Sequence, residues 1–161
     1  MRRLLLTRHA KSDWSTDALD DHARPLNKRG RRDAPKIGAL VQSLGWCPEL
    51  VLCSSALRAI ETLTGLRAAW DVQPDVRILP SLYHAGADAA RAALATVPDA
   101  VTTVMLIGHN PGLEETLTAL CGARETLPTA SVAMLQGEGA RWAEVAAFEL
   151  VRVLRPKVDL G

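Results

Sequence analysis

The chain has 161 residues, of which 48% are hydrophobic and 23% charged, and its 19 basic and 18 acidic side chains leave a net charge of +1. This size fits a single domain over residues 1–161, and the near-neutral charge argues against a nucleic-acid or membrane partner. The chain contains neither the ~18 consecutive apolar residues of a membrane span nor the apolar region of a signal peptide. We therefore expect a cytoplasmic protein; we favour a monomer, although the sequence leaves the oligomeric state open.

The cysteines and the isolated histidines predict no metal site. Cys47, Cys53 and Cys121 are an odd number with no close-spaced pair, so neither a disulfide framework nor a Cys-rich zinc site is expected. His22 and His84 have no histidine or carboxylate partner at a ligand spacing such as HExxH. We expect no metal and no cofactor. We expect neither histidine to have a functional role; a position at the mouth of a pocket is the alternative considered for each.

The first part of the chain alternates between predicted strands and a predicted helix. Residues 4–7 and 50–54 are short apolar runs bounded by polar or small residues, which is typical of strands buried on both faces. Between them, Asn27 is a good cap for a helix that runs to about Leu44, and Gly45 is a good terminator.

The middle of the chain continues this alternation. Residues 56–70 have apolar positions at helical spacing, residues 76–79 predict a weaker strand, and the Ala-rich residues 88–96 predict a helix. Residues 103–108 predict a further buried strand. Pro111 follows at a position where the first turn of a helix tolerates proline.

The end of the chain is less distinct. Residues 131–136 predict a strand, whereas residues 142–154 fit either a strand or a helix. The alternation of strands and helices predicts an α/β fold with three layers, in which helices cover both faces of a mostly parallel central sheet.

The candidate functional residues follow the three strongest predicted strands, in "TRHAK", "CSSALR" and "GHNPG". Ligands of open α/β sheets bind outside the carboxyl ends of the strands, so Arg8, His9, Arg58 and His109 are expected to meet there. Arginine binds phosphate through a planar fork that keeps its charge. A neutral imidazole, with an ordinary pKa near ~6.5, has a lone pair that can attack phosphorus. The sequence therefore predicts a phosphoryl-transfer site.

These motifs, together with "RPLNKRG", resemble those of the histidine phosphatase superfamily, the phosphoglycerate-mutase-like enzymes. The short chain and the "DDHARPLNKRGRRDA" segment are similar to its small branch, the SixA-type phosphohistidine phosphatases. The resemblance implies that His9 is the nucleophile that becomes phosphorylated, with Arg8 beside it as a phosphate clamp. It further implies that Arg58 and Arg24 bind the phosphate and that His109 stabilises the transferring group.

Two departures from the superfamily's patterns bear on the mechanism. Ala10 stands where the Arg-His-Gly motif has glycine, and Asn110 stands where the acid-phosphatase subgroup has aspartate. We expect Asp21 to protonate the leaving group, with Asp20 or Asp13 as substitutes. This weak signal for an acid favours phosphohistidine as substrate, because its labile P–N bond needs less help from an acid than an ester bond does.

Three other hypotheses stay open. A small-metabolite or phosphomonoester phosphatase of the same superfamily shares the fold, and an inactive module that binds phosphohistidine or phosphate would use the same arginines. A cysteine phosphatase is disfavoured, because four residues separate Cys53 from Arg58 where that family has five.

A cluster of cations suggests a second feature. Lys28, Arg29, Arg31 and Arg32 fall in the first turns of the first predicted helix, where the helix dipole disfavours positive charge. We hypothesise that this edge attracts a phosphorylated or acidic partner.

Overall fold

The computed structural model describes residues 1–15 and 20–161. Within that part of the chain, six strands form one mixed sheet in the order β3-β2-β4-β1-β5-β6. The pairs β3–β2, β2–β4 and β4–β1 are parallel, whereas β5 is antiparallel to both of its neighbours. The strands are β1 (Arg2–Arg8), β2 (Leu50–Ser54), β3 (Asp75–Leu79), β4 (Thr103–Gly108), β5 (Val132–Gly137) and β6 (Glu149–Leu154).

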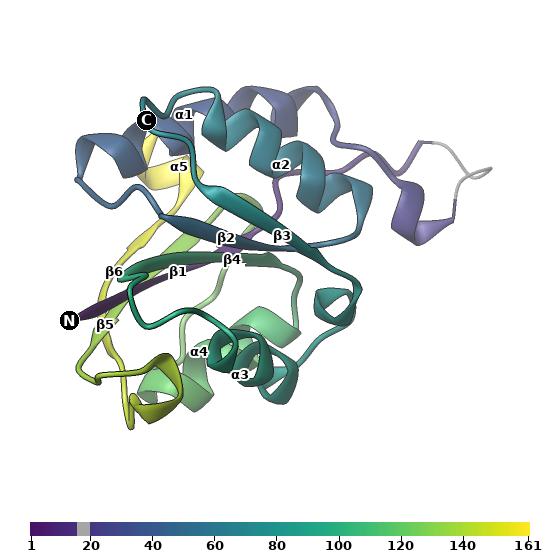
Figure 1. Ribbon diagram of the computed structural model, residues 1–161. Helices are drawn as coiled ribbons and strands as arrows, with labels where there is room; N and C mark the ends of the chain where they lie inside the picture. The colour runs from purple at the N-terminus through teal and green to yellow at the C-terminus, as the bar shows by residue number, and fades with distance from the viewer. Residues whose placement is uncertain (16–19) are drawn as a thin grey trace.

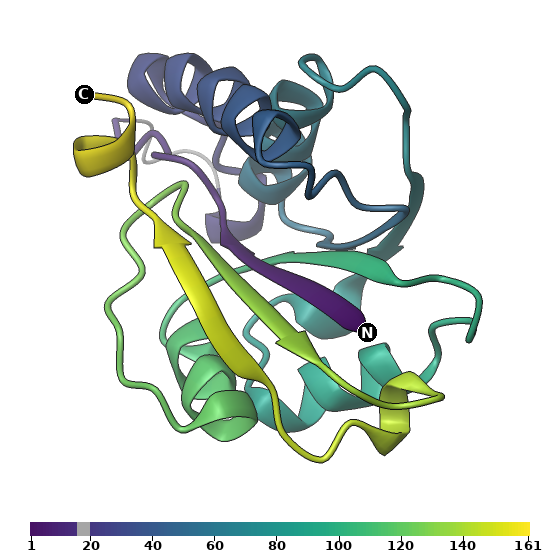
Figure 2. The same ribbon diagram turned by 90° about the vertical axis from the view of Figure 1, so that its left-hand side faces the viewer.

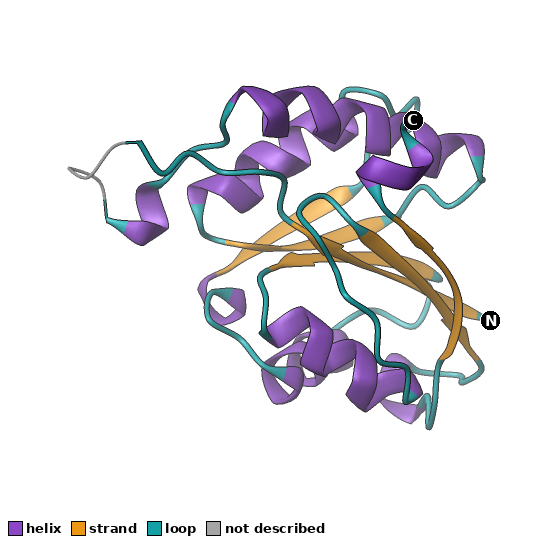
Figure 3. Ribbon diagram, turned by 180° about the vertical axis from the view of Figure 1, so that it is seen from behind, coloured by secondary structure: helices purple, strands orange, loops and turns teal. Residues whose placement is uncertain are grey.

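Helices cover both faces of the sheet, which confirms the expected three-layer α/β/α class (Figure 1). Figure 3 shows α1, α2 and α5 on one side of the sheet and α3 and α4 on the other. The helices are α1 (Lys28–Ser43), α2 (Leu57–Arg67), α3 (Ala87–Ala95), α4 (Gly112–Cys121) and α5 (Pro156–Asp159), with 3-10 turns η1 (Asp21–Ala23), η2 (Pro80–Leu82) and η3 (Trp142–Glu144). None of these helices is long and apolar enough to span a bilayer.

The central strand β1 shows why its apolar run is continuous. Successive side chains of a strand point to opposite faces, so a sheet covered on both faces needs apolar residues at every position. Leu4 and Leu6 pack into the core on the α3–α4 side, whereas Leu5 packs into the core on the α1–α2 side. All three are fully buried.

The ends of α1 confirm the prediction from its capping residues. The side chain of Asn27 accepts a hydrogen bond from the Gly30 N–H at 2.9 Å, which satisfies one free donor of the first turn. The chain leaves the helix through Gly45 at φ +74°, a left-handed conformation that glycine adopts without a Cβ clash.

Four details differ from the sequence predictions or settle them. The helix expected over residues 56–70 ends at Arg67, and Pro111 lies just before α4 instead of in its first turn. Residues 149–154 form strand β6, which extends the sheet beside β5 (Figure 2). The short helix α5, which follows β6, was not predicted.

Candidate active site

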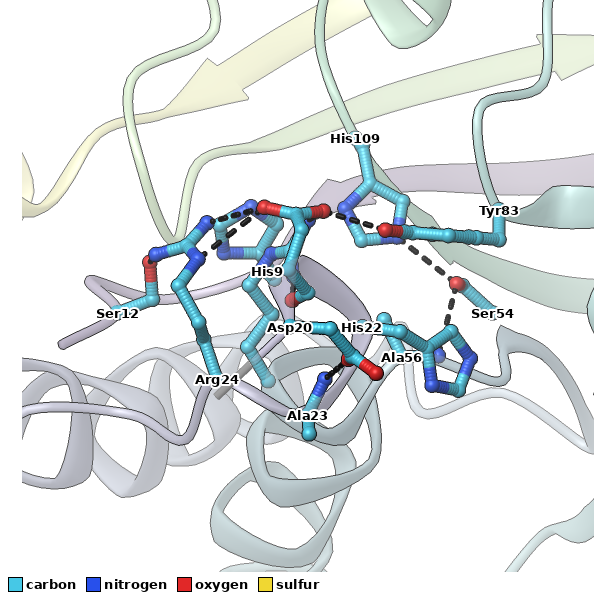
Figure 4. A network of polar contacts seen from close by, with 12 residues as sticks. His9, Ser12, Asp20, His22, Ala23, Arg24, Ser54, Ala56, Tyr83 and His109 are labelled. Atoms are coloured by element: carbon cyan, nitrogen blue, oxygen red, sulfur yellow. Dashed lines mark hydrogen bonds and ion pairs between the residues drawn. The ribbon is translucent and has the colours of Figure 1, made fainter. Parts of the chain in front are cut away.

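The carboxyl ends of β1, β2 and β4 meet at one edge of the sheet because these neighbouring strands are parallel. Arg8 ends β1 and His9 follows it, Arg58 lies in the first turn of α2 after β2, and His109 follows β4. The ring centroids of His9 and His109 are 5.0 Å apart. Figure 4 shows both imidazoles facing the same small region as Arg24 and Tyr83. The structure thus brings the two predicted histidines together.

His9 is held in one tautomer by its own main chain. Its Nδ1 lies 2.7 Å from the Ala10 carbonyl oxygen, which can only accept, so Nδ1 carries the hydrogen and Nε2 keeps a lone pair. The side chain is only 6% exposed. Burial, with the neighbouring charges of His109 and Arg58 adding to it, lowers the pKa of His9 to about 3. His9 is therefore a neutral base at physiological pH.

His109 is held from the opposite side by Ser54, the last residue of β2. Its Nε2 lies 2.8 Å from the Ser54 hydroxyl, which also accepts a hydrogen bond from the Ala56 N–H. Burial, followed by the charge of Arg58, lowers the pKa of His109 to about 4. Its Nδ1 is buried and has no hydrogen-bond partner among the described residues. Buried polar atoms are normally hydrogen-bonded, so a ligand atom is a suitable partner for this nitrogen.

The three predicted arginines line the same region. Arg58 is 5% exposed and donates from Nη1 to the main-chain oxygen of Asp21 at 2.6 Å. Arg24 is 7% exposed and donates from Nη1 to the Ser12 hydroxyl at 2.7 Å. Arg8 donates to the Leu127 carbonyl, and burial lowers its pKa from the ordinary arginine value. Two guanidinium groups are thus nearly fully buried, which requires anionic or carbonyl partners.

Asp21 supplies the anionic partner for two of these arginines. One carboxylate oxygen lies 3.1 Å from both Nε and Nη2 of Arg24, and the other lies 3.1 Å from Nη2 of Arg58. The Tyr83 hydroxyl donates to that second oxygen at 2.5 Å. The hydrogen bond from Tyr83, followed by the two arginines, holds the pKa of Asp21 well below its ordinary value. In this arrangement Asp21 is ionised at neutral pH and has no proton to donate.

The two substitutes considered for Asp21 bind main-chain groups instead. The Asp20 carboxylate accepts from the Ala23 N–H at 3.0 Å and caps the turn η1. The Asp13 carboxylate accepts from the Ser15 N–H at 2.7 Å. Of the three carboxylates considered, Asp21 is the one that contacts the buried arginines.

Tyr83 and Ser54 are site residues that the sequence analysis missed. Tyr83 is the only tyrosine of the chain, and its ring lies 5.6 Å from that of His109. The rings of His22 and His84 flank this ring, at 4.8 Å and 3.9 Å between centroids, which favours the alternative considered for these two histidines over the absence of a role. His84 and His109 both line an adjoining cavity of about 230 Å³. The "SLYH" sequence, considered for its histidine, was the available signal for Tyr83.

The replacement of glycine by Ala10 causes no backbone strain. Among the described non-glycine residues only His84 and Ala130 have a positive φ, so residue 10 adopts a conformation open to any side chain. Ala10 is fully buried, and its N–H donates to the Thr62 hydroxyl at 2.9 Å. The loop after His9 is therefore fixed without glycine.

Cys53 is unsuited to act as a nucleophile. It is fully buried in the core on the α1–α2 side, and this burial raises the pKa of its thiol to about 12. The thiolate form that a cysteine phosphatase needs is therefore negligible at neutral pH.

Comparison with known proteins agrees with this geometry. The model of the histidine phosphatase superfamily (branch 1) matches residues 4–84. An uncharacterized chloroplastic protein of Arabidopsis thaliana is 40% identical over 157 residues, which cover 91% of this chain and 72% of the relative.

Two solved structures, both of candidate SixA phosphohistidine phosphatases, share the fold. The protein from Agrobacterium tumefaciens is 29% identical with a TM-score of 0.84, covering 96% of this chain and 98% of that one. The protein from Nakamurella multipartitia is 30% identical with a TM-score of 0.85, covering 96% of each chain. The chain therefore belongs to the histidine phosphatase superfamily (branch 1), and within it to the SixA-type branch.

Proposed function

We propose that this phosphatase removes the phosphoryl group from phosphohistidine in a protein, through a phosphoenzyme formed on His9. The observation that carries the proposal is the state of His9, a neutral imidazole whose Nε2 lone pair is free beside two buried arginines. Phosphoryl transfer requires positioning and stabilisation of charge above all, and these groups supply both.

The reaction has two steps. In the first, Nε2 of His9 forms a bond to phosphorus while the bond from phosphorus to the substrate nitrogen breaks. Arg8, Arg24 and Arg58 carry the charge on the three phosphoryl oxygens, and His109 donates a hydrogen bond from Nδ1. In the second step water attacks phosphorus, the bond to Nε2 breaks, and inorganic phosphate leaves.

The hydrogen bond from Ser54 supports the proposed role of His109 as a donor to the phosphoryl group. The Ser54 oxygen already accepts the Ala56 N–H, so its own hydrogen is available for Nε2 of His109. A neutral His109 that accepts at Nε2 carries its hydrogen on Nδ1, the buried atom that lacks a partner among the described residues. The two histidines thus have different roles: His9 attacks phosphorus with the lone pair of Nε2, and His109 donates a hydrogen bond from Nδ1.

Asp21 enters the mechanism only after the phosphoryl group has bound. The phosphoryl oxygens compete with its carboxylate for Arg24 and Arg58. Once these partners are lost, the pKa of Asp21 rises toward its ordinary value near ~3.9, which still leaves the carboxylate ionised at neutral pH. The leaving nitrogen therefore takes its proton from solvent, and the Asp21 carboxylate accepts a proton from the attacking water in the second step. A substrate whose leaving group needs little protonation fits this arrangement, which supports phosphohistidine over an alkyl phosphate ester.

The test is a substrate panel with wild type and His9→Ala. We expect wild type to have a higher kcat/KM on a phosphohistidine peptide than on p-nitrophenyl phosphate and sugar phosphates. His9→Ala should lose at least about 10³-fold in kcat, because it removes the attacking atom. Brief mixing with labelled substrate and acid-free gel analysis should trap label on wild type alone.

Each alternative makes a distinct prediction in this panel. Equal or better kcat/KM on sugar phosphates contradicts the phosphohistidine assignment and favours a metabolite phosphatase. Binding of the phosphopeptide without turnover or trapped label identifies an inactive binding module. As a matched control, Cys53→Ser should keep wild-type activity, since that thiol is buried and protonated.

A further inference from the structure

A second cationic region lies outside the site described above, between α1 and α5. It surrounds a cavity of about 460 Å³, a volume within the usual range for ligand sites. We name it the α1–α5 cavity and define it by Arg29, Arg32, Asp33, Lys36, Pro156, Lys157, Leu160 and Gly161.

The charge of this cavity differs from that of the rest of the chain. Four of its lining side chains are cationic and one is acidic, which leaves 15 basic and 17 acidic side chains elsewhere. The excess of positive charge is thus concentrated here, while the remainder of the molecule is slightly negative. Such a local field attracts anionic ligands and steers their approach.

Two of the four cations of the cavity are held in ion pairs, and two are not. The Asp33 side chain is 8% exposed and lies 3.5 Å from Nε of Arg29 and 3.2 Å from Nε of Arg32, so one buried carboxylate orients two guanidinium groups. Lys36 and Lys157 are exposed, and neither has an ion-pair partner in the part of the chain that the structure describes.

Stability of α1 does not explain these cations. Residues 29, 32 and 36 are spaced to share one side of the helix, and two of them fall in its N-terminal turns, where the dipole disfavours positive charge. The first turn contains no acidic residue that would compensate. Asp33 pairs with Arg29 and Arg32, so Lys36 is the cation on this side of α1 that has no ion-pair partner among the described residues.

The cavity lies at the same edge of the sheet as His9. β6 runs antiparallel to β5, which runs antiparallel to β1, so the ends of β6 and β1 point the same way with one strand between them (Figure 2). Arg155, which precedes α5, bonds to Glu125 and to the Thr126 carbonyl. The next carbonyl, that of Leu127, accepts from Arg8. One loop therefore connects the wall of the cavity to the phosphate site.

We infer that the α1–α5 cavity binds an acidic segment of the same protein whose phosphohistidine enters the active site. This inference rests on the proposed function, because it makes the cavity a second contact for the substrate protein. It refines the sequence hypothesis on the basic run: of those four residues, Arg29 and Arg32 line the cavity, whereas Lys28 and Arg31 do not. A nucleic acid would need a longer basic stripe than four side chains around one hollow.

The experiment uses two synthetic peptides that carry one phosphohistidine and differ only in a four-residue tract, glutamate in one and glutamine in the other. A spacer of about three to six residues separates the tract from the phosphohistidine, because two strand spacings cover about 10 Å and an extended chain about 3.3 Å per residue. Phosphoramidate serves as a substrate that is too small to reach the cavity.

The test variant is Lys36→Glu/Lys157→Glu, which leaves the Asp33 ion pairs intact. The matched control is Arg91→Glu/Arg141→Glu, which changes the net charge equally with two exposed arginines. Arg91 lies on α3 across the sheet, and Arg141 lies before η3 and β6, at the opposite end of β6 from α5. At low salt we expect wild type and the control to prefer the glutamate peptide about tenfold in kcat/KM. The test variant should lose this preference, and all three proteins should turn over phosphoramidate alike.

Two results overturn the inference: a wild type with no preference for glutamate, or an equal loss of preference in the test and control variants. Failure of the proposed function gives a different result, since wild type would then hydrolyse neither peptide. In that case His9→Ala is titrated with the unphosphorylated glutamate peptide by fluorescence anisotropy. Binding that Lys36→Glu/Lys157→Glu abolishes supports the cavity, and its absence overturns it.

Discussion

The two cationic regions of this protein hold their charges in different ways. At the candidate active site, Arg24 and Arg58 are nearly fully buried and bound to a carboxylate. At the α1–α5 cavity, Arg32 is 60% exposed, and Lys36 and Lys157 are exposed without an ion pair among the described residues. Buried charges fixed by several contacts keep one geometry and are little affected by salt, whereas exposed charges act over a distance and are screened. The first region suits chemistry and the second suits association.

This comparison explains why the acidic partners also differ. Asp21 bridges two arginines at a place that, under the proposed mechanism, the substrate must take over. Asp33 bridges Arg29 and Arg32 from the buried side of its cavity and leaves the open side to the lysines. Under the two proposals, Asp21 competes with the phosphoryl group for its arginines, whereas Asp33 holds in place the arginines that attract an acidic segment.

The largest effect is expected from the buried arginines. Arg58→Ala should lower kcat/KM by about 10²-fold or more on every substrate, because it removes a buried guanidinium group that stabilises developing charge. Arg58→Lys should recover little, since an ammonium group lacks the planar fork. The loss should stay constant between 50 and 300 mM salt. A loss that changes with salt would contradict the view that the charges of the active site, unlike those of the α1–α5 cavity, are little screened.

The second effect concerns acid stability, to which the buried histidines contribute. His9 has a pKa of about 3 in the folded protein and an ordinary value near 6.5 when unfolded, so the unfolded state binds more protons between these values. The free energy of unfolding is therefore expected to fall as the pH drops below about 6.5. For His9 this amounts to on the order of 2 kcal/mol between pH 7 and pH 4.5.

Urea unfolding of wild type and His9→Gln at these two pH values measures this contribution. The variant has no imidazole at position 9, so its unfolding free energy should depend less on pH. An identical pH dependence in both proteins would show that His9 titrates normally in the folded state.

The smallest effect concerns competition by Asp21. Asp21→Asn removes the negative charge from Arg24 and Arg58, and inorganic phosphate should then inhibit about fivefold more strongly, the equivalent of one modest ion pair. Asp20→Asn is the matched control, because its carboxylate caps η1. Weaker inhibition in Asp21→Asn would mean that the carboxylate supports anion binding.

Sequence reasoning located the site because strand ends were recognisable. The runs at residues 50–54 and 103–108 coincide with β2 and β4, and the carboxyl-end rule then placed Arg58 and His109 near His9. Tyr83 could not be found in this way. It contacts Asp21 across 62 positions of sequence, and neither residue belongs to a strand.

The edge of the sheet was ambiguous for a related reason. Most side chains of β6 are partly or fully exposed, so this strand lacks the continuous apolar run of β1 and β4. Only its pairing with β5, which includes an irregularity between Met134 and Leu135, identifies it as a strand. Because α5 and the residues after it line the α1–α5 cavity, only the α1 half of that surface could be predicted from the sequence.

The hydrogen bond from Nδ1 of His9 to the Ala10 carbonyl determines which ring nitrogen can react. An electrophile that reaches this ring meets a single reactive nitrogen, the one farther from the main chain, so any covalent adduct forms as one positional isomer. The acceptor belongs to the backbone, and every amino acid has that carbonyl. Changes of residue type at position 10 therefore leave the regiochemistry untouched for as long as the loop keeps its path.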